Sequence, residues 1–467
     1  MTGSKLPLLN NATRDLATFA ALLQYEDLPR SVIERIKTSL LDSIGCCLYG
    51  LTLPWTQRVL AMVDEDGGKP VASLWRTGRR TSISNAVLVN CTAGHAFELD
   101  DIHKESILHP GSIAIPTALA FADRAGKVSG REAITAMASG YEVGTRVGNA
   151  ATMSLFFRGF HPQGTSGAFV SAATAGRALR LDATAMQHAL GIVGSQAGGL
   201  MAAQEGAMVK RFHAGRAAQS GVYSALLAKQ GFTGIVDVLE APYGGYLSTY
   251  SDAPNAARLT DGLGTEWETA KIGYKPHAAV TSIHAALDAL TYIMQSNGLH
   301  ANDIMHVDVG VSAMTHVHCA WPYRAQGVTA AQMNLYYGLA VTAIDGVAFV
   351  AQYHEGRLAD PRILDFIARI DACIDPQIEA LGPAFRHAAR VSVMTRGGIT
   401  LTHEIMNRRG SNENPISPRE IEIKFQALTE SCLSPRDIAQ IIYLCERFDE
   451  LDDISELLAL LAAPRLH

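Results

Sequence analysis

The segment from His95 to Ser112, HAFELDDIHKESILHPGS, concentrates side chains that take up or release protons. Buried charges shift one another's pKa values, and such clusters are typical of acid–base sites. Because Asp100 and Asp101 are adjacent, repulsion should raise the pKa of at least one of them unless a cation such as Lys104 is near. A solvated helix end with capping carboxylates is the structural alternative. The candidate residues are Glu98, Asp100, Asp101, His103 and His109.

Two further segments have the same character. In GFHPQGTSGA, His161 precedes a turn that opens a helix, and the free N–H groups of such a turn bind carboxylate or phosphate. In MVKRFHAGRA, Lys210 and Arg211 could neutralise substrate carboxylates, and a desolvated lysine could act as a base. An ordinary capped loop and a basic surface turn are the structural alternatives. Together the three segments predict one site that transfers a proton at the carbon α to a carboxylate.

Histidines later in the chain carry weaker signals. His277 and His284 lie near an expected domain junction and are typical of structural histidines with satisfied hydrogen bonds. His316 and His318 alternate along the sequence, so we assign them to a strand without a functional role.

Length and composition limit the classes of protein. A chain of 467 residues predicts two domains, and a net charge of −6 without a basic run disfavours binding to nucleic acid. The N-terminal sequence has no secretion signal, and no apolar run reaches the roughly 18 residues that span a bilayer, so we expect a cytoplasmic protein without membrane contact. The seven cysteines form no C-x-x-C pair, and no zinc-ligand spacing occurs, so no metal site or disulfide framework is expected.

The first 268 residues contain repeated helix signals. Ser31 to Glu34 and Ser129 to Glu132 have the form of capping boxes, and Asp182 precedes another helical pattern. The first of these helices should end near Gly50, and a later one should run on from Gly215. Many of the expected helices are rich in Ala, Gly and Ser, which predicts close packing between helix axes.

The pattern changes after Glu268. Residues 304–314 alternate between apolar and polar, and two further alternating runs meet at Gly397-Gly398, which predicts a hairpin. Helix starts with a Ser cap and Pro return at Ser417 and Ser434. We therefore predict a mainly α protein with a discontinuous all-helical domain over 1–268 and 409–467 and a smaller α+β lid domain over 269–408.

At the same segments the chain closely resembles the MmgE/PrpD family. The matching stretches run nearly end to end and include LDSIGCCLYG, NAVLVNCTAGHAFELDDIHKESILHPGS, GYEVGTRVG, GFHPQGTSGA, KRFHAGRAAQSG and QMNLYYGLAVTAIDG. The family includes 2-methylcitrate dehydratases, cis-aconitate decarboxylases and iminodisuccinate epimerase. The resemblance implies a helical domain with an α+β lid, no cofactor, a small anionic carboxylate as substrate, and a homodimer.

The resemblance also assigns residues. The family's acidic motif falls on Glu98, Asp100 and Asp101, and its lid tyrosine and later helix histidine fall on Tyr337 and His284. The candidate catalytic residues are Asp100, Asp101, His109, His161 and Lys210. The candidate substrate-binding residues are Glu98, His103, Arg211, His284 and Tyr337.

Two departures from the family pattern affect the expected reaction. Dehydratases and decarboxylases of the family typically have Thr at the position of Ile102, and Pro-Cys-Arg at Ala279-Val280-Thr281. Without that hydroxyl and that cation, loss of hydroxide or of a carboxylate is less well supported. We therefore predict a cofactor-independent epimerase of an iminodisuccinate-like dicarboxylate, with the acidic segment on one face and Lys210 or His161 on the other. The enzyme alternatives are a 2-methylcitrate dehydratase-like hydro-lyase and a cis-aconitate decarboxylase-like lyase; the non-enzyme alternative is a helical scaffold that binds a partner.

Overall fold

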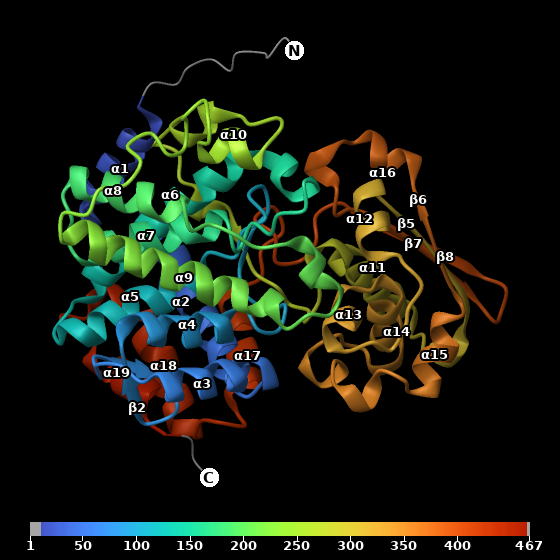
Figure 1. Ribbon diagram of the computed structural model, residues 1–467. Coiled ribbons are helices and arrows are strands. Elements are labelled where there is room, and N and C mark those ends of the chain that lie inside the picture. Colours follow the sequence, from blue (N-terminus) through green and yellow to red (C-terminus); the bar gives the residue numbers. More distant parts are fainter. Residues whose placement is uncertain (1–10, 465–467) are drawn as a thin grey trace.

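The computed structural model describes residues 11–464 and consists mainly of helices built around two hydrophobic cores (Figure 1). The first core extends from Ala12 to Tyr274 and takes in further residues from Ile421 to Leu461. Most of the second core comes from residues 278–393. The predicted fold class, mainly α with a smaller α+β part, is confirmed.

The first core is almost entirely helical. Two short pairs of strands accompany it, β1 (Ala72–Leu74) with β2 (Arg79–Thr81) and β3 (Ile102–His103) with β4 (Ile272–Gly273). Its helices are α1 (Ala12–Leu22), α2 (Arg30–Gly50), α3 (Pro54–Asp66), α4 (Ile83–Gly94), α5 (Gly111–Ala125), α6 (Gly130–Phe157), α7 (Ser166–Ala178), α8 (Ala183–Gly194), α9 (Val209–Lys229), α10 (Tyr246–Tyr250), α17 (Pro418–Thr429), α18 (Pro435–Glu446) and α19 (Ser455–Ala462). The last three lie beside α2 to α5, so the end of the chain returns to its beginning (Figure 1).

Several helix starts follow the sequence signals. Ser129 and Glu132 form the expected capping box, and the side chain of Asp182 accepts a hydrogen bond from the third residue of α8. Ser417 and Ser434 cap α17 and α18, each with Pro as the first helical residue. These local signals are confirmed.

Two helices begin earlier than the sequence indicated. Helix α2 starts at Arg30 because the carbonyl of Pro29 already accepts the first helical hydrogen bonds, so Ser31 lies inside the helix and caps nothing. Helix α9 starts at Val209 rather than near Gly215. The basic segment is therefore the first turns of a packed helix, and the alternative of a basic surface turn is wrong.

The small residues permit close contact between helices, as expected. A Cβ atom at Gly140 in α6 would lie 1.9 Å from the hydroxyl oxygen of Thr174 in α7. One at Gly144, one turn later, would lie 2.1 Å from a methyl carbon of Val170. Any side chain at either glycine would force the two helices apart.

The second core surrounds a four-stranded sheet of order β6-β5-β7-β8. Strand β5 pairs parallel with β6 and antiparallel with β7, and β7 and β8 form the predicted hairpin. The strands are β5 (Ile304–Val311), β6 (Ile370–Ile374), β7 (Ala389–Thr395) and β8 (Thr400–Ile405), and the helices are α11 (Thr281–Asn297), α12 (Ala313–Cys319), α13 (Val328–Met333), α14 (Leu335–Asp345), α15 (Pro361–Ile367) and α16 (Pro376–Ala380). Helix α11 packs on β7 and β8.

Two features of this part were not predicted correctly. Strand β6 was missed, and the segment around His316 and His318 is helix α12 instead of a strand. The side chain of Ser312 caps α12 by accepting a hydrogen bond from the backbone of Thr315, which ends the alternating pattern of β5. His318 therefore lies on the side of the lid that faces the helical body.

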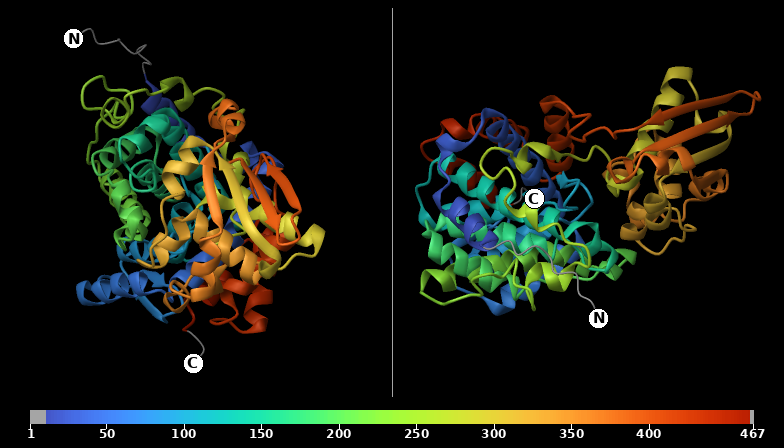
Figure 2. Two further views of the ribbon diagram at one scale, coloured as in Figure 1. Left: turned by 90° about the vertical axis from the view of Figure 1, so that its right-hand side faces the viewer. Right: turned by 90° about the horizontal axis from the view of Figure 1, so that it is seen from above.

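The two parts stand side by side, and α12 and α13 lie between the sheet and the helical body (Figures 1 and 2). The side chain of His318 hydrogen-bonds Gln204 of the helical body through Nε2, at 2.7 Å from Oε1. Among residues 11–464, no helix has the length and apolar character needed to cross a bilayer.

Candidate active site

A small polar cavity of about 70 Å³ lies where the lid meets the helical body. It is bordered by the segment after α4, the loop before α7, the first turn of α9, the chain leading into α11, and the lid. Four residues predicted from three separate segments line it together: Glu98, His109, His161 and Lys210. The expectation of one composite site therefore fits the geometry.

The carboxylate of Glu98 is the negative centre of this cavity. It is buried and accepts hydrogen bonds from Lys210, from Arg211 at 2.6 Å and from Lys275 at 3.1 Å. Burial alone would raise the pKa of Glu98, but the three cations hold it well below its usual value. Glu98 is thus an ionised residue that orders the cations around it.

Positive charge exceeds negative charge around the cavity. Burial lowers the pKa of Lys210 to about 8, against the opposing attraction of Glu98. Arg386 and Arg408 also line the cavity, and Glu98 is the one carboxylate among its described lining residues. Because one carboxylate cannot balance several cations, the site is suited to a ligand with more than one carboxylate.

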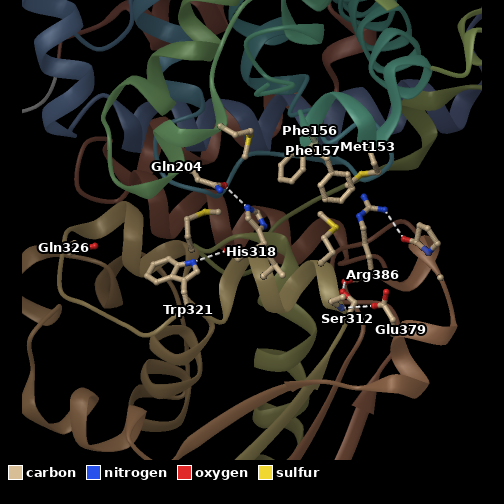
Figure 3. Close-up of a pocket in the computed structure, with 17 residues that line it drawn as sticks. Met153, Phe156, Phe157, Gln204, Ser312, His318, Trp321, Gln326, Glu379 and Arg386 are labelled. Atoms are coloured by element: carbon tan, nitrogen blue, oxygen red, sulfur yellow. Dashed lines mark hydrogen bonds between the residues drawn. The ribbon is translucent and has the colours of Figure 1, made fainter. Parts of the chain in front are cut away.

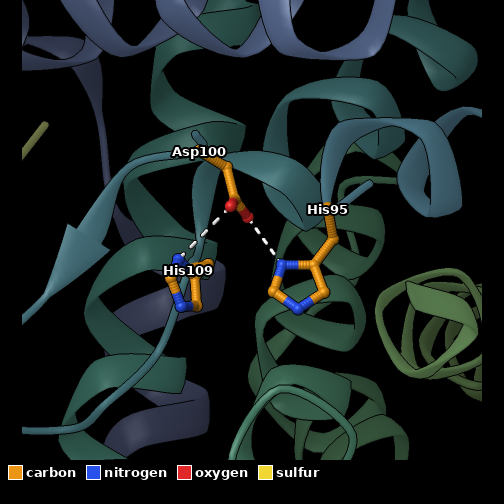
Figure 4. A group of neighbouring side chains, drawn as sticks. All are labelled: His95, Asp100 and His109. Carbon is orange, nitrogen blue, oxygen red and sulfur yellow. Dashed lines mark hydrogen bonds and ion pairs between the residues drawn. The ribbon is translucent and has the colours of Figure 1, made fainter. Parts of the chain in front are cut away.

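Hydrogen bonds fix the orientation of His109. Its Nδ1 lies 2.7 Å from the carbonyl oxygen of Asp101 and donates to it, which leaves Nε2 as the free nitrogen. The carboxylate of Asp100 lies between two imidazoles, 2.7 Å from Nδ1 of His95 and 3.5 Å from Nδ1 of His109 (Figure 4). Asp100 therefore supports both rings and does not itself line the cavity.

Burial keeps the imidazoles beside Asp100 neutral. Burial lowers the pKa of His109 to about 3, although the negative charge of Asp100 opposes that shift. Burial likewise lowers the pKa of His95. The pKa of Asp100 lies below its usual range, because the adjacent His109 and His95 outweigh the effect of burial. A carboxylate ligand would reverse part of the shift on His109, since a nearby negative charge favours the imidazolium form.

His161 belongs to the same group of rings. Its Nδ1 lies 2.8 Å from Nδ1 of His213, so one ring donates to the other. Burial lowers the pKa of both, that of His213 to about 4. The ring centroids of His95 lie 5.0 Å from those of His109 and 5.8 Å from those of His161. Four imidazoles thus form a row, and His109 and His161 are the two of them that line the cavity.

Asp101 lies behind the cavity and positions its neighbours. Its carboxylate accepts hydrogen bonds from the Tyr141 hydroxyl at 2.7 Å and from the backbone N–H of Gly111 at 2.9 Å. Burial raises the pKa of Asp101 to about 8, so the expected rise within the Asp pair is present with burial as its main cause. Lys104, a candidate partner of that pair, instead contacts Glu413 at 3.2 Å.

Other predicted residues lie outside the cavity. His103 contacts Glu268 at 3.0 Å, and Arg211 reaches from Glu98 to the side chain of Gln332. His284 bonds the carbonyl oxygen of Ala279 through Nε2, and the Tyr337 hydroxyl donates to the carbonyl oxygen of Gln352 inside the lid core. The structure thus does not bring His103, His284 or Tyr337 to the cavity, because each is held by a partner elsewhere.

Sequence reasoning missed several lining residues. Lys275, Arg386 and Arg408 lie outside the three segments that were singled out, and His318 was assigned to a strand without a functional role, yet all four line the cavity. The one available signal was the position of Lys275, before Pro276 at the expected domain junction. The residues at which the chain departs from the family pattern, Ile102, Val280 and Thr281, also line the cavity.

The group in Figure 4 has the composition of a metal site. One ligand atom from each of His95, Asp100 and His109 lies within 4.8 Å of the other two. Nδ1 of His95 and Nδ1 of His109 each donate a hydrogen bond to an oxygen, so neither has a lone pair for a metal. These bonds make the group a hydrogen-bonded support for His109, and an ion would have to be held through the Nε2 atoms.

Comparison with known proteins agrees with the resemblance. Sequence models of the MmgE/PrpD N-terminal domain and C-terminal domain match residues 14–258 and 277–448. The chain is 30% identical to the cis-aconitate decarboxylase-like protein oryM of Aspergillus oryzae, over 97% of each chain. It is 30% identical to a cis-aconitate decarboxylase of Aspergillus terreus, over 97% of this chain and 96% of that one. The chain is 26% identical to the human cis-aconitate decarboxylase, over 98% of this chain and 96% of that one. This chain is therefore a member of the MmgE/PrpD family.

Proposed function

We propose that the protein is a lyase that decarboxylates a small unsaturated polycarboxylate of the cis-aconitate type. The observation that carries the proposal is the set of cations around Glu98, which leaves uncompensated positive charge for substrate carboxylates. The curated relatives are named as decarboxylases, which are lyases, so they support this alternative better than the epimerase favoured by the sequence.

The reaction needs a proton donor beside a bound polyanion. The bond between a saturated carbon and its carboxylate breaks, CO₂ leaves, and the released electron pair forms a new double bond to the neighbouring carbon. The electron pair of the old double bond then takes one proton at its far carbon. One proton is consumed for each CO₂ released, and the organic product carries one negative charge fewer than the substrate.

We assign the proton delivery to His109. Its free Nε2 belongs to a ring that lines the cavity, and Asp100 lies close enough to stabilise the imidazolium. Binding of several carboxylates raises the pKa of the ring, so the ring takes a proton from solvent when the substrate binds. Lys210 and Lys275, with Arg386 at the lid side, bind the carboxylates that remain on the product.

A second candidate is the epimerase predicted from the sequence. Ile102 stands where the family typically has a hydroxyl and Thr281 stands where it typically has a cation, and both residues line the cavity. Without that hydroxyl and that cation, the departure of a group has less assistance. In that reaction His109 and Lys210 are the two candidate bases that remove and return a proton. The reaction then ends without loss of CO₂ and without a new double bond.

A substrate panel separates the two. Purified protein is incubated with cis-aconitate, 2-methylcitrate and an aminodicarboxylate such as iminodisuccinate, while CO₂, ultraviolet absorbance and optical rotation are recorded. The proposal expects CO₂ from cis-aconitate at a rate that depends on Lys210. Loss of optical rotation from the aminodicarboxylate without CO₂ from any compound would instead establish the epimerase. The homodimer implied by the resemblance stays a prediction, which sedimentation of the purified chain tests.

A further inference from the structure

A second, much larger cavity of about 960 Å³ opens beside the polar one (Figure 3). Its walls combine apolar residues from both parts of the chain. The helical body contributes Met153, Phe156, Phe157 and Met201, and the lid contributes Met314, Val317, Trp321 and Met333. A carboxylate gains nothing from such walls, so this space is suited to an apolar group.

The two cavities share a boundary. Seven residues line both of them: Phe156, Met201, Gln204, Met314, His318, Met333 and Arg386. The polar atoms of this boundary point to a charged ligand, because Nε of Arg386 is buried without a hydrogen-bond partner among the described residues. The guanidinium is otherwise held by the carbonyl oxygens of Pro383 and Lys104. A molecule can therefore place carboxylates in the inner cavity and extend past Arg386 into the outer one.

Part of the apolar wall is exposed. The side chain of Phe157 is 69% exposed and that of Val317 is 79% exposed, although they lie on opposite sides of the same cavity. Exposed apolar residues that converge on one hollow are typical of a binding site. The lining methionines are flexible and adapt to ligands of different shape.

The backbone of α6 is strained where it turns toward this cavity. Thr152 has φ 60° and ψ −172°, a conformation that is costly for a β-branched residue. Its hydroxyl donates to the carbonyl oxygen of Ala253 and accepts from the backbone N–H of Ser154. The residues just after this kink are the ones that reach the cavity, Met153, Phe156 and Phe157. Backbone strain at a single residue is typical of functional sites, where the position of the neighbouring side chains matters for binding.

We infer that the preferred substrate is a polycarboxylate that carries an apolar chain. Its carboxylates occupy the inner cavity around Lys210 and Arg386, and its chain occupies the outer cavity between Phe157 and Val317. This inference rests on the proposed function for the reaction, but it concerns binding and is tested without turnover.

The binding test uses saturated 2-alkylsuccinates, which have no double bond and cannot undergo the proposed reaction. Calorimetry measures Kd for succinate and for its methyl, butyl, hexyl and octyl derivatives. Burial of a methylene group strengthens binding by up to about fourfold. We expect Kd to fall at least tenfold from the methyl to the hexyl compound. The same series of alkyl-substituted cis-aconitates, assayed for CO₂, tests the reaction separately.

Two double variants test where the alkyl chain of the ligand binds. In the double variant Phe157→Ser and Val317→Ser the dependence of Kd on chain length should be lost. The matched control is Phe232→Ser with Ile399→Ser, two exposed apolar residues that line neither cavity, and it should keep the full dependence.

Each other outcome overturns the inference. A flat Kd across the series in the unaltered protein would mean that the outer cavity does not bind the chain. If Kd of the Phe157 and Val317 variant still depends on the length of the alkyl chain, the alkyl chain binds elsewhere. If that variant instead changes the sedimentation of the protein from dimer to monomer, the wall is an interface between copies. Absence of CO₂ from every substrate would contradict the proposed function. The alkylsuccinate series would still show whether the outer cavity binds an alkyl chain.

Discussion

Nδ1 of His109 donates to the carbonyl oxygen of Asp101 across 2.7 Å, and this one contact decides which nitrogen of the ring is free. The carbonyl is held in place because the carboxylate of the same aspartate is bound by Tyr141 and by the first N–H of α5. The ring therefore has a single tautomer in the empty site, with a lone pair on Nε2. Bound carboxylates raise the pKa of this nitrogen, so it takes a proton from solvent and becomes an acid at the reacting carbon.

Replacement of His109 by Asn tests its role. The amide of Asn can keep the hydrogen bond to Asp101 but has no counterpart of Nε2. We expect kcat to fall by about 10²- to 10⁴-fold with little change in KM, since acid–base groups contribute on that scale. Steady-state kinetics on cis-aconitate measures this, with exposed His354→Asn as the control. A variant with nearly full kcat would remove His109 from the mechanism.

Binding of a polyanion should take up a proton. Burial holds the pKa of His109 near 3 in the empty site, and bound carboxylates raise it toward neutrality. Calorimetry with propane-1,2,3-tricarboxylate at pH 7, in buffers of different ionisation enthalpy, should show uptake of roughly one proton. The uptake should disappear in His109→Asn. Equal uptake in both proteins would assign the proton to another group.

Lys210 should set an alkaline limit. Its pKa is about 8 in the empty site, so the ammonium is lost above that pH and the attraction for carboxylates is lost with it. We expect kcat/KM to fall as pH rises through about 8, while kcat falls only at higher pH, because bound carboxylates raise the pKa of Lys210. In Lys210→Arg the alkaline fall in kcat/KM should move out of the measurable pH range, since arginine stays charged. If kcat/KM of this variant still falls near pH 8, the titrating group is another residue.

Asp101 should make stability depend on pH. Burial raises its folded pKa to about 8, above the unfolded value, so its contribution is complete at low pH and is lost as pH rises through 8. The effect is on the order of a few kcal/mol. Urea unfolding at pH 5.5 and pH 8.5 measures it, and Asp101→Asn should reduce the difference. Exposed Asp452→Asn is the control, and an equal reduction there would refute the assignment.

Removal of divalent metal should leave activity intact. Nδ1 of His95 and Nδ1 of His109, the nitrogens that face Asp100, donate hydrogen bonds and so cannot ligate an ion. After prolonged dialysis against a chelator, we expect kcat within about twofold of the untreated value, a change that corresponds to only a few tenths of a kcal/mol. Activity that vanishes and returns with Zn²⁺ would show that the group holds a metal.

Much of the helical part follows from local signals. The capping box at Ser129 and the Ser-Pro starts of α17 and α18 each satisfy free backbone N–H groups, so the local sequence was sufficient. The start of α9 was not marked in this way, because Met208 caps it without a side-chain hydrogen bond. As a result the alternative of a basic surface turn was wrong, and Lys210 is buried in the first turn of a packed helix.

The site was predictable where charges cluster in the sequence and not where they are isolated. Glu98 and His109 stand in one dense segment, whereas Lys275 and Arg386 each come from a different part of the chain. Tertiary contacts alone bring those cations to the cavity. His284 shows the opposite error, because its expected role came from the resemblance while its ring is held by a carbonyl oxygen away from the cavity.

The most direct measurement follows cis-aconitate in D₂O by NMR while CO₂ is collected. The account predicts one deuterium in the organic product for each CO₂ released, at the carbon that received the proton, with both signals reduced together in His109→Asn. Deuterium that enters cis-aconitate itself, with its carbon skeleton intact and no CO₂ formed, would contradict it.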